Sequence, residues 1–196
     1  TKFPIIDAFL SVPREKFVPD GKREAAYIGE NFKIGQSRVI LEPRTLAKLL
    51  DALDIHNDEL VLDIGIGLGY SSAIISLIAE VVIAVDDDSS LASEAEEILS
   101  EIGVDNVVVQ VSKLEEGAPE HGPYDVVILQ GGIEEIPVSI LNQLKDGGRI
   151  GAIFVEQGLG TAKIGFKIND KINWRYSFNA AAPVLPGFFK QKDFAL

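Results

Sequence analysis

The stretch VLDIGIGLGY, residues 61–70, decides the fold. It begins as an apolar run, passes into three glycines at alternate positions, and ends where a helical pattern starts. Glycine lets the backbone turn sharply and approach a ligand with no Cβ in the way, and the first N–H groups of the following helix are free to bind that ligand. We expect residues 65–69 to form a ligand-binding loop between a buried strand and a helix.

Around this loop, from about residue 43 to residue 155, apolar runs alternate with helical patterns, which predicts βαβ units on a parallel sheet. The tail differs, because the polar turn sequence at residues 169–171 lies between two β-type runs and favours an antiparallel hairpin. The expected strands are 59–64, 81–85, 106–111, 124–129, 149–155, 162–168 and 172–178. The expected helices are 5–10, 43–53, 70–79, 91–102 (capped by Ser89 or Ser90 and stopped by Gly103) and 138–144.

Length and composition fit one compact domain. The chain has 196 residues, of which 46% are hydrophobic and 24% are charged, and this is typical of a single globular core. We predict an N-terminal cap and substrate loop over residues 1–42, a ligand-binding core over residues 43–155, and an antiparallel hairpin and tail over residues 156–196. Together, these three parts of the chain predict an α/β fold with a doubly wound, mostly parallel sheet.

Charge and residue usage exclude several kinds of site. Residues 51–125 contain 18 acidic residues and one basic residue, within a net charge of −12, and this argues against a nucleic-acid surface there. Cysteine is absent, and His56 and His121, the two histidines, lie in polar turn-like stretches, so we expect no metal site and no thiol or histidine catalysis. No long uncharged apolar run or secretory signal is evident, which favours a cytoplasmic protein without membrane contact.

The spacing of the loop indicates which ligand it holds. A dinucleotide fingerprint needs G-x-G-x-x-G, but its third glycine would fall on Tyr70, and Gly69 comes one residue early. Asp63 would repel a pyrophosphate but suits an ammonium or sulfonium group. Asp86 ends the next strand, where it could accept hydrogen bonds from two ribose hydroxyls. These features predict a cationic nucleoside ligand, although a tight turn, a solvated strand-end acid and a polar loop at residues 86–88 would explain each one separately.

Further segments resemble one family of class I S-adenosylmethionine-dependent methyltransferases. VPREKFVP at residues 12–19, PYDVVILQGGIEEIP at 123–137 and LNQLKDGGRI at 141–150, together with the loop and the Ala26-Tyr27 pair, are similar to the protein-L-isoaspartate O-methyltransferases. The resemblance covers roughly residues 4–155. It implies a Rossmann-like, seven-stranded sheet with S-adenosyl-L-methionine over the carboxyl ends of the strands.

The resemblance also implies residue roles. The loop glycines would line the methionyl part of the cofactor, Asp63 would hold its amino group, Asp86 its ribose, and Gln130 would lie near the reacting methyl. A carboxylate acceptor is already ionised at neutral pH, so its attack on a sulfonium methyl needs orientation and no general base. The predicted cofactor-binding residues are Asp63, Gly65, Gly67, Gly69, Tyr70, Asp86, Asp87, Leu114 and Gln130.

The substrate loop departs from the family pattern. The family's loop resembles GQTISQP, whereas this chain has GQSRVILEP at residues 35–43, which is two residues longer. Alignment on either end places Val39 or Leu41 where the family has serine. Ser37 or Arg38 could replace that hydroxyl, and Arg38 is chemically the better clamp for a carboxylate. The family's aspartate near the adenine is Lys113 here, so backbone groups at Lys113 and Leu114 would have to serve.

These observations predict methyl transfer from S-adenosyl-L-methionine to isoaspartyl residues of damaged proteins, with Ser37 and Arg38 as the catalytic candidates. Two alternatives stay open. The chain could methylate another acceptor, because the substrate loop is the part that diverges, or it could be a catalytically silent cofactor-binding or interaction domain. A nicotinamide dehydrogenase is a more distant alternative. The sequence indicates no oligomeric state.

Overall fold

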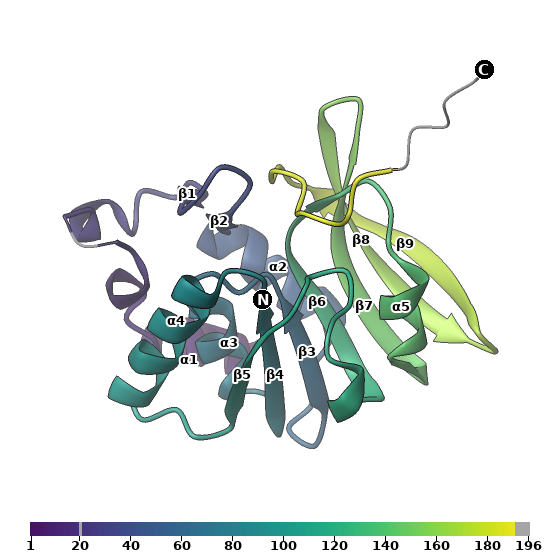
Figure 1. Ribbon diagram of the computed structural model, residues 1–196, viewed down its shortest axis with the longest axis horizontal. Coiled ribbons are helices and arrows are strands. Elements are labelled where there is room, and N and C mark those ends of the chain that lie inside the picture. The colour runs from purple at the N-terminus through teal and green to yellow at the C-terminus, as the bar shows by residue number, and fades with distance from the viewer. Residues whose placement is uncertain (20, 191–196) are drawn as a thin grey trace.

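The computed structural model describes residues 1–19 and 21–190. A seven-stranded sheet has the order β5-β4-β3-β6-β7-β8-β9 (Figure 1). Its first five strands in that order run parallel, β8 is antiparallel to β7, and β9 is antiparallel to β8. The predicted fold class is confirmed. The strands are β3 (Leu60–Ile64), β4 (Val81–Asp86), β5 (Val107–Val111), β6 (Tyr124–Ile133), β7 (Leu144–Glu156), β8 (Leu159–Ile168) and β9 (Lys171–Asn179).

Helices cover both faces of the sheet because its strands carry apolar side chains on alternate sides. In β3, Val61 belongs to the core cluster that contains the buried side chains of α1 and α2, whereas Leu62 belongs to the cluster on the opposite face. The predicted apolar face of α2, at Leu46, Leu49, Leu50 and Leu53, is fully buried. The helices are α1 (Phe3–Ser11), α2 (Pro43–Leu53), α3 (Tyr70–Ser76), α4 (Ser89–Glu101) and α5 (Val138–Asn142).

Several predicted boundaries are wrong for identifiable reasons. The N-cap of α4 is Asp88, whose carboxylate accepts hydrogen bonds from the N–H groups of Ser90 and Leu91, so neither Ser89 nor Ser90 caps the helix. The helix α3 ends at Ser76 instead of residue 79. The strand β6 extends past residue 129 because Gly132 and Ile133 pair with β7, and the N–H of Gly132 also donates to the carbonyl of Pro183 at 2.8 Å.

Two segments distant in sequence lie over the carboxyl ends of the strands. A short hairpin of β1 (Phe32–Lys33) and β2 (Val39–Ile40), which the sequence did not indicate, belongs to the N-terminal lead-in. The C-terminal segment at residues 180–190 runs beside the end of β6 (Figure 1). The predicted tail continues to residue 196, and its residues 191–196 lie outside the described residues. Within the part of the chain that the structure describes, no helix is long and apolar enough to cross a membrane.

Candidate active site

The candidate site lies at the carboxyl end of β3, where β4 and β6 flank the strand on either side. Connections leave such a point in opposite directions and open a crevice for a ligand. Asp63 stands there in register with Ala84 of β4 and Ile128 of β6. The loop that follows begins at Gly65, whose N–H donates to the carbonyl of Val85 at 2.8 Å, and this ties the loop to the neighbouring strand.

The loop needs glycine for two separate reasons. Gly65, Gly67 and Gly69 have φ values of 81°, 56° and 89°, a conformation that other residues rarely adopt. Space is restricted as well, since a Cβ built on Gly67 would lie 2.3 Å from Cδ1 of Ile34. A Cβ on Gly69 would instead lie 3.2 Å from Cβ of Ala95 in α4. Thus Gly67 faces the crevice side of the loop, whereas Gly69 permits close packing between helices.

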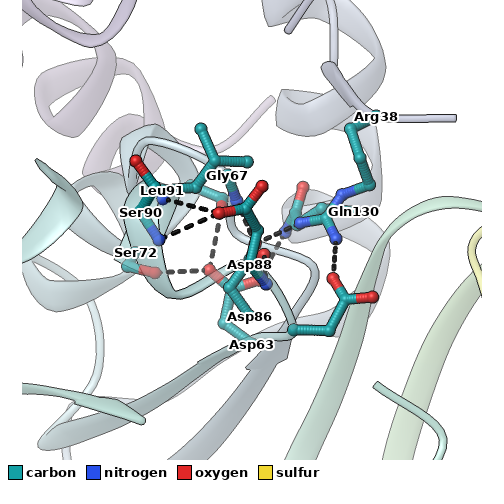
Figure 2. A network of polar contacts seen from close by, with 11 residues as sticks. Arg38, Asp63, Gly67, Ser72, Asp86, Asp88, Ser90, Leu91 and Gln130 are labelled. Carbon is teal, nitrogen blue, oxygen red and sulfur yellow. Dashed lines mark hydrogen bonds and ion pairs between the residues drawn. The ribbon is translucent and has the colours of Figure 1, made fainter. Parts of the chain in front are cut away.

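Asp63 is completely buried and is held by three donors. Its Oδ2 accepts hydrogen bonds from the hydroxyls of Ser71 at 2.6 Å and Ser72 at 2.7 Å, and its Oδ1 accepts one from Nε2 of Gln130 at 2.7 Å (Figure 2). Burial raises the pKa of Asp63 to about 6 despite these donors, and the negative charge of Asp86 adds to the rise. A cation placed beside Asp63 would therefore be strongly favoured.

Asp86 is also completely buried, at the end of β4. Its Oδ2 accepts from the N–H of Gly67 at 2.7 Å, its Oδ1 from the N–H of Asp88 at 3.1 Å, and the guanidinium of Arg38 forms an ion pair with it (Figure 2). Burial raises the pKa of Asp86, while Arg38 and the backbone donors oppose that rise. The second guanidinium nitrogen of Arg38 pairs with Asp87 at 2.7 Å.

The structure gathers most of the predicted cofactor residues at this crevice. Gln130 contacts Asp63 directly, and Asp87 borders a hollow of about 530 Å³ together with Ser37 and Arg38. Tyr70 behaves differently, since its ring packs against Phe9 and Phe17 and beneath the guanidinium of Arg14. The side chain of Leu114 is buried in the core, so only its backbone is available to a ligand.

Apolar side chains occupy the positions that the family pattern gives to serine. Val39 and Leu41 are buried, and both border a cavity of about 10 Å³ that Ser71 and Gln130 also line. A space of this size accommodates no more than about one water molecule. This part of the crevice is therefore filled by β2 and the residue after it, and Arg38 directly precedes that strand.

The arrangement suits S-adenosylmethionine on structural grounds. Its glycine loop lies beside two buried carboxylates at the ends of neighbouring strands, and the side chains nearest to Gly65 and Gly67 are those of Ile34, Leu185 and Arg38. A nucleoside with ribose hydroxyls, an ammonium and a sulfonium matches those two anions, whereas a pyrophosphate would meet repulsion from both.

Sequence reasoning missed four contributors. Ser71 and Ser72 supply donors to Asp63, and their position in the first turn of the helix after the loop was a usable signal. Leu185 was not predictable, because 120 residues separate it from Gly65. Its methyl groups nevertheless lie 3.4 and 3.5 Å from a Cβ built on Gly65. Ile34 covers Gly67 through a hairpin whose two-residue strands are too short to show a pattern.

Comparisons with known proteins place the chain in a family. Residues 2–175 match the family described as Protein-L-isoaspartate(D-aspartate) O-methyltransferase (PCMT). A protein-L-isoaspartate O-methyltransferase of Syntrophus aciditrophicus (strain SB) is 34% identical over 146 residues, which is 74% of this chain and 67% of that protein. The Methanocella arvoryzae relative of the same name is 39% identical over 142 residues, 71% of this chain and 76% of its own.

Other curated relatives are matched over less of their length, for instance 64% for one from Pelotomaculum thermopropionicum, so the chain spans about two thirds of the proteins it resembles. A solved protein-L-isoaspartate O-methyltransferase superimposes with a TM-score of 0.85 at 24% identity, over 95% of this chain and 62% of that one. The Plasmodium falciparum structure described as a putative protein-L-isoaspartate O-methyltransferase in complex with S-adenosyl-L-homocysteine gives 0.81 at 18% identity, over 94% and 90%.

At these identities the solved structures support the fold, and the sequence matches support the family. The prediction of an S-adenosylmethionine-dependent methyltransferase is confirmed at the level of the family. Since the match extends over most of the chain, including the glycine loop and both buried aspartates, the chain belongs to the protein-L-isoaspartate(D-aspartate) O-methyltransferase family.

Proposed function

We propose that this chain transfers a methyl group from S-adenosyl-L-methionine to the free carboxylate of isoaspartyl residues in proteins. The observation that carries the proposal is the pair of buried carboxylates, Asp63 and Asp86, at the carboxyl ends of β3 and β4 beside a glycine loop. We propose isoaspartyl carboxylates as the acceptor because the chain belongs to this family. We also propose that the protein acts in the cytoplasm.

Each residue group has a distinct task in the proposed reaction. S-adenosylmethionine supplies an activated methyl group when it is bound. Asp63 would hold its ammonium group and Asp86 its ribose, and Gly65 and Gly67 of the loop would lie along the part of the cofactor between them. An isoaspartyl carboxylate has an ordinary pKa near 4, so the protein needs no base and contributes alignment and exclusion of water.

The acceptor carboxylate requires a positive charge or hydrogen-bond donors. Arg38 precedes β2 and Ser37 lies beside it, and both border the hollow of about 530 Å³ near Asp87. We assign Arg38 as the residue that grips the acceptor carboxylate, with Ser37 as a further donor, because the apolar Val39 and Leu41 have no hydroxyl to offer.

The test uses two peptides of identical sequence, one with aspartate and one with isoaspartate at a single position. Incubation with tritiated S-adenosylmethionine is expected to label only the isoaspartyl peptide, and Asp86→Ala is expected to reduce labelling to background. No label in either peptide, from a protein that binds S-adenosyl-L-homocysteine, would contradict the proposed activity.

A methyltransferase acting on another acceptor is the second candidate. The observation that favours it is the replacement of the serine by buried Val39 and Leu41 beside Gln130. Labelling of a protein extract with tritiated S-adenosylmethionine, with no label in the isoaspartyl peptide, would support this candidate over the first.

A further inference from the structure

We infer that Arg38 and the ribose of the cofactor compete for Asp86, so that cofactor binding releases the guanidinium for the acceptor carboxylate. The inference rests on the proposed function, since it concerns the order in which the same site takes its two ligands. The juxtaposition that supports it is the ion pair between Arg38 and Asp86 on the floor of the crevice.

Asp86 has too few acceptor positions to bind Arg38 and both ribose hydroxyls at the same time. An ionised carboxylate has about four acceptor positions. The N–H groups of Gly67 and Asp88 and the guanidinium of Arg38 use three of them. Among the residues that the structure describes, this leaves one position, whereas a ribose that donates both hydroxyls needs two.

Space leads to the same conclusion. A Cβ built on Gly65 would lie 3.8 Å from Nη2 of Arg38 and 3.4 Å from a methyl group of Leu185, so the guanidinium shares with Leu185 the space over this backbone. The side chain of Arg38 is only 9% exposed in this position. A nucleoside on the glycine loop and the arginine on Asp86 therefore need the same volume.

The release requires only the side chain of Arg38 to move. The hairpin of β1 and β2 is anchored, because Phe32, Val39 and Ile40 are buried in the core. Its loop, residues 34–38, borders the hollow of about 530 Å³, which gives the guanidinium room to turn away. Asp87, 33% exposed, holds the other side of the guanidinium and acts as a positioning residue.

Calorimetric titration with S-adenosyl-L-homocysteine tests the competition without any methyl transfer. Arg38→Gln removes the competing charge, and we expect about tenfold tighter binding, equivalent to 1.4 kcal/mol. Asp87→Asn should also tighten binding, but should add nothing in the Arg38→Gln background, because Asp87 acts through the guanidinium. Lys33→Gln, which removes an exposed charge from the same hairpin, is the matched control and should leave the affinity unchanged.

Binding of the isoaspartyl peptide tests whether the cofactor releases Arg38 from Asp86. In the unmodified chain, saturating S-adenosyl-L-homocysteine should tighten peptide binding at least about tenfold, and this coupling should disappear in Arg38→Gln. NMR of the unmodified chain gives a measurement that requires no variant. The Arg38 Nε–H resonance should shift on addition of the nucleoside and exchange faster with solvent.

The outcomes separate this inference from the function on which it rests. Normal nucleoside binding with equal or weaker affinity in a folded Arg38→Gln variant would overturn the competition alone. An unchanged Arg38 resonance in the saturated complex would overturn it as well. No nucleoside binding by any of these proteins would overturn the proposed function and this inference together.

Discussion

Replacement of Asp63 by asparagine should make the protein more stable and unable to bind its cofactor. The side chain is completely buried, and its pKa rises from 3.8 to about 6 because the charged form is desolvated. At 1.36 kcal/mol for each tenfold change in the ionisation constant, the buried charge destabilises the folded state by about 3 kcal/mol. An asparagine of the same shape removes that charge and can still accept from the two serine hydroxyls.

The predicted stabilisation depends on pH in a defined direction. Between about pH 4 and pH 6 the folded chain binds more protons at Asp63 than the unfolded chain does, so this group lowers stability as the pH rises. The destabilisation is complete above the folded pKa and absent below the unfolded one. Asp63→Asn should therefore exceed the unmodified chain in free energy of unfolding by about 3 kcal/mol at pH 7 and match it near pH 4.

Urea unfolding of both proteins at pH 7.0, 5.5 and 4.0 measures this difference. Ser72→Ala is the matched control, because it removes a donor to the carboxylate, raises the pKa of Asp63 further and should destabilise the fold at pH 7 by about 1.5–3 kcal/mol. A stability difference between Asp63→Asn and the unmodified chain that stays constant with pH would refute the reasoning. A less stable Asp63→Asn at pH 7 would refute it as well.

Two further pairs of variants test the loop and the scaffold. Gly67→Ala places a side chain at a φ of 56° and 2.3 Å from Ile34, and should lower the free energy of unfolding by about 1–2 kcal/mol and abolish nucleoside binding. Gly103→Ala is the control, because it imposes similar backbone strain at a φ of 78° in open space. It should leave nucleoside binding intact. Equal nucleoside affinity in the two glycine variants would contradict the assigned role of the loop. Arg149→Ala breaks a two-bond ion pair with Glu59 at 2.7 Å in which both side chains are about 15% exposed, and thermal unfolding should show a loss of about 3 kcal/mol. Lys145→Ala, at the more exposed pair with Asp125, should lose no more than about 1 kcal/mol, and a loss as large as that of Arg149→Ala would show that burial does not set the difference.

The parallel core could be predicted because its signals are local. Strong alternation of apolar runs and helical patterns predicted the order of elements from residue 43 onward, and Pro43 and Gly103 marked helix ends that the structure confirms. The C-terminal hairpin was also predictable, since Asn169 and Asp170 both adopt positive φ values in the tight turn between β8 and β9.

The surroundings of the site were harder to predict because they depend on distant segments. Leu185 and Ile34 reach the glycine loop from opposite ends of the chain, and no local pattern predicts such contacts. Arg38 was identified as a candidate from its chemistry, but its pairing with Asp86 joins two residues that the sequence analysis had given to different ligands. The sequence thus identified Asp63, Asp86 and Arg38 as candidates, but it did not predict the contacts that the structure shows among them and their neighbours.

A crystal structure of the chain with S-adenosyl-L-homocysteine tests the central claim most directly. We predict the nucleoside along residues 65–67, with its ribose hydroxyls on Asp86 and its ammonium beside Asp63. A nucleoside found at another place on the protein, with both carboxylates still making only the contacts described above, would contradict the account.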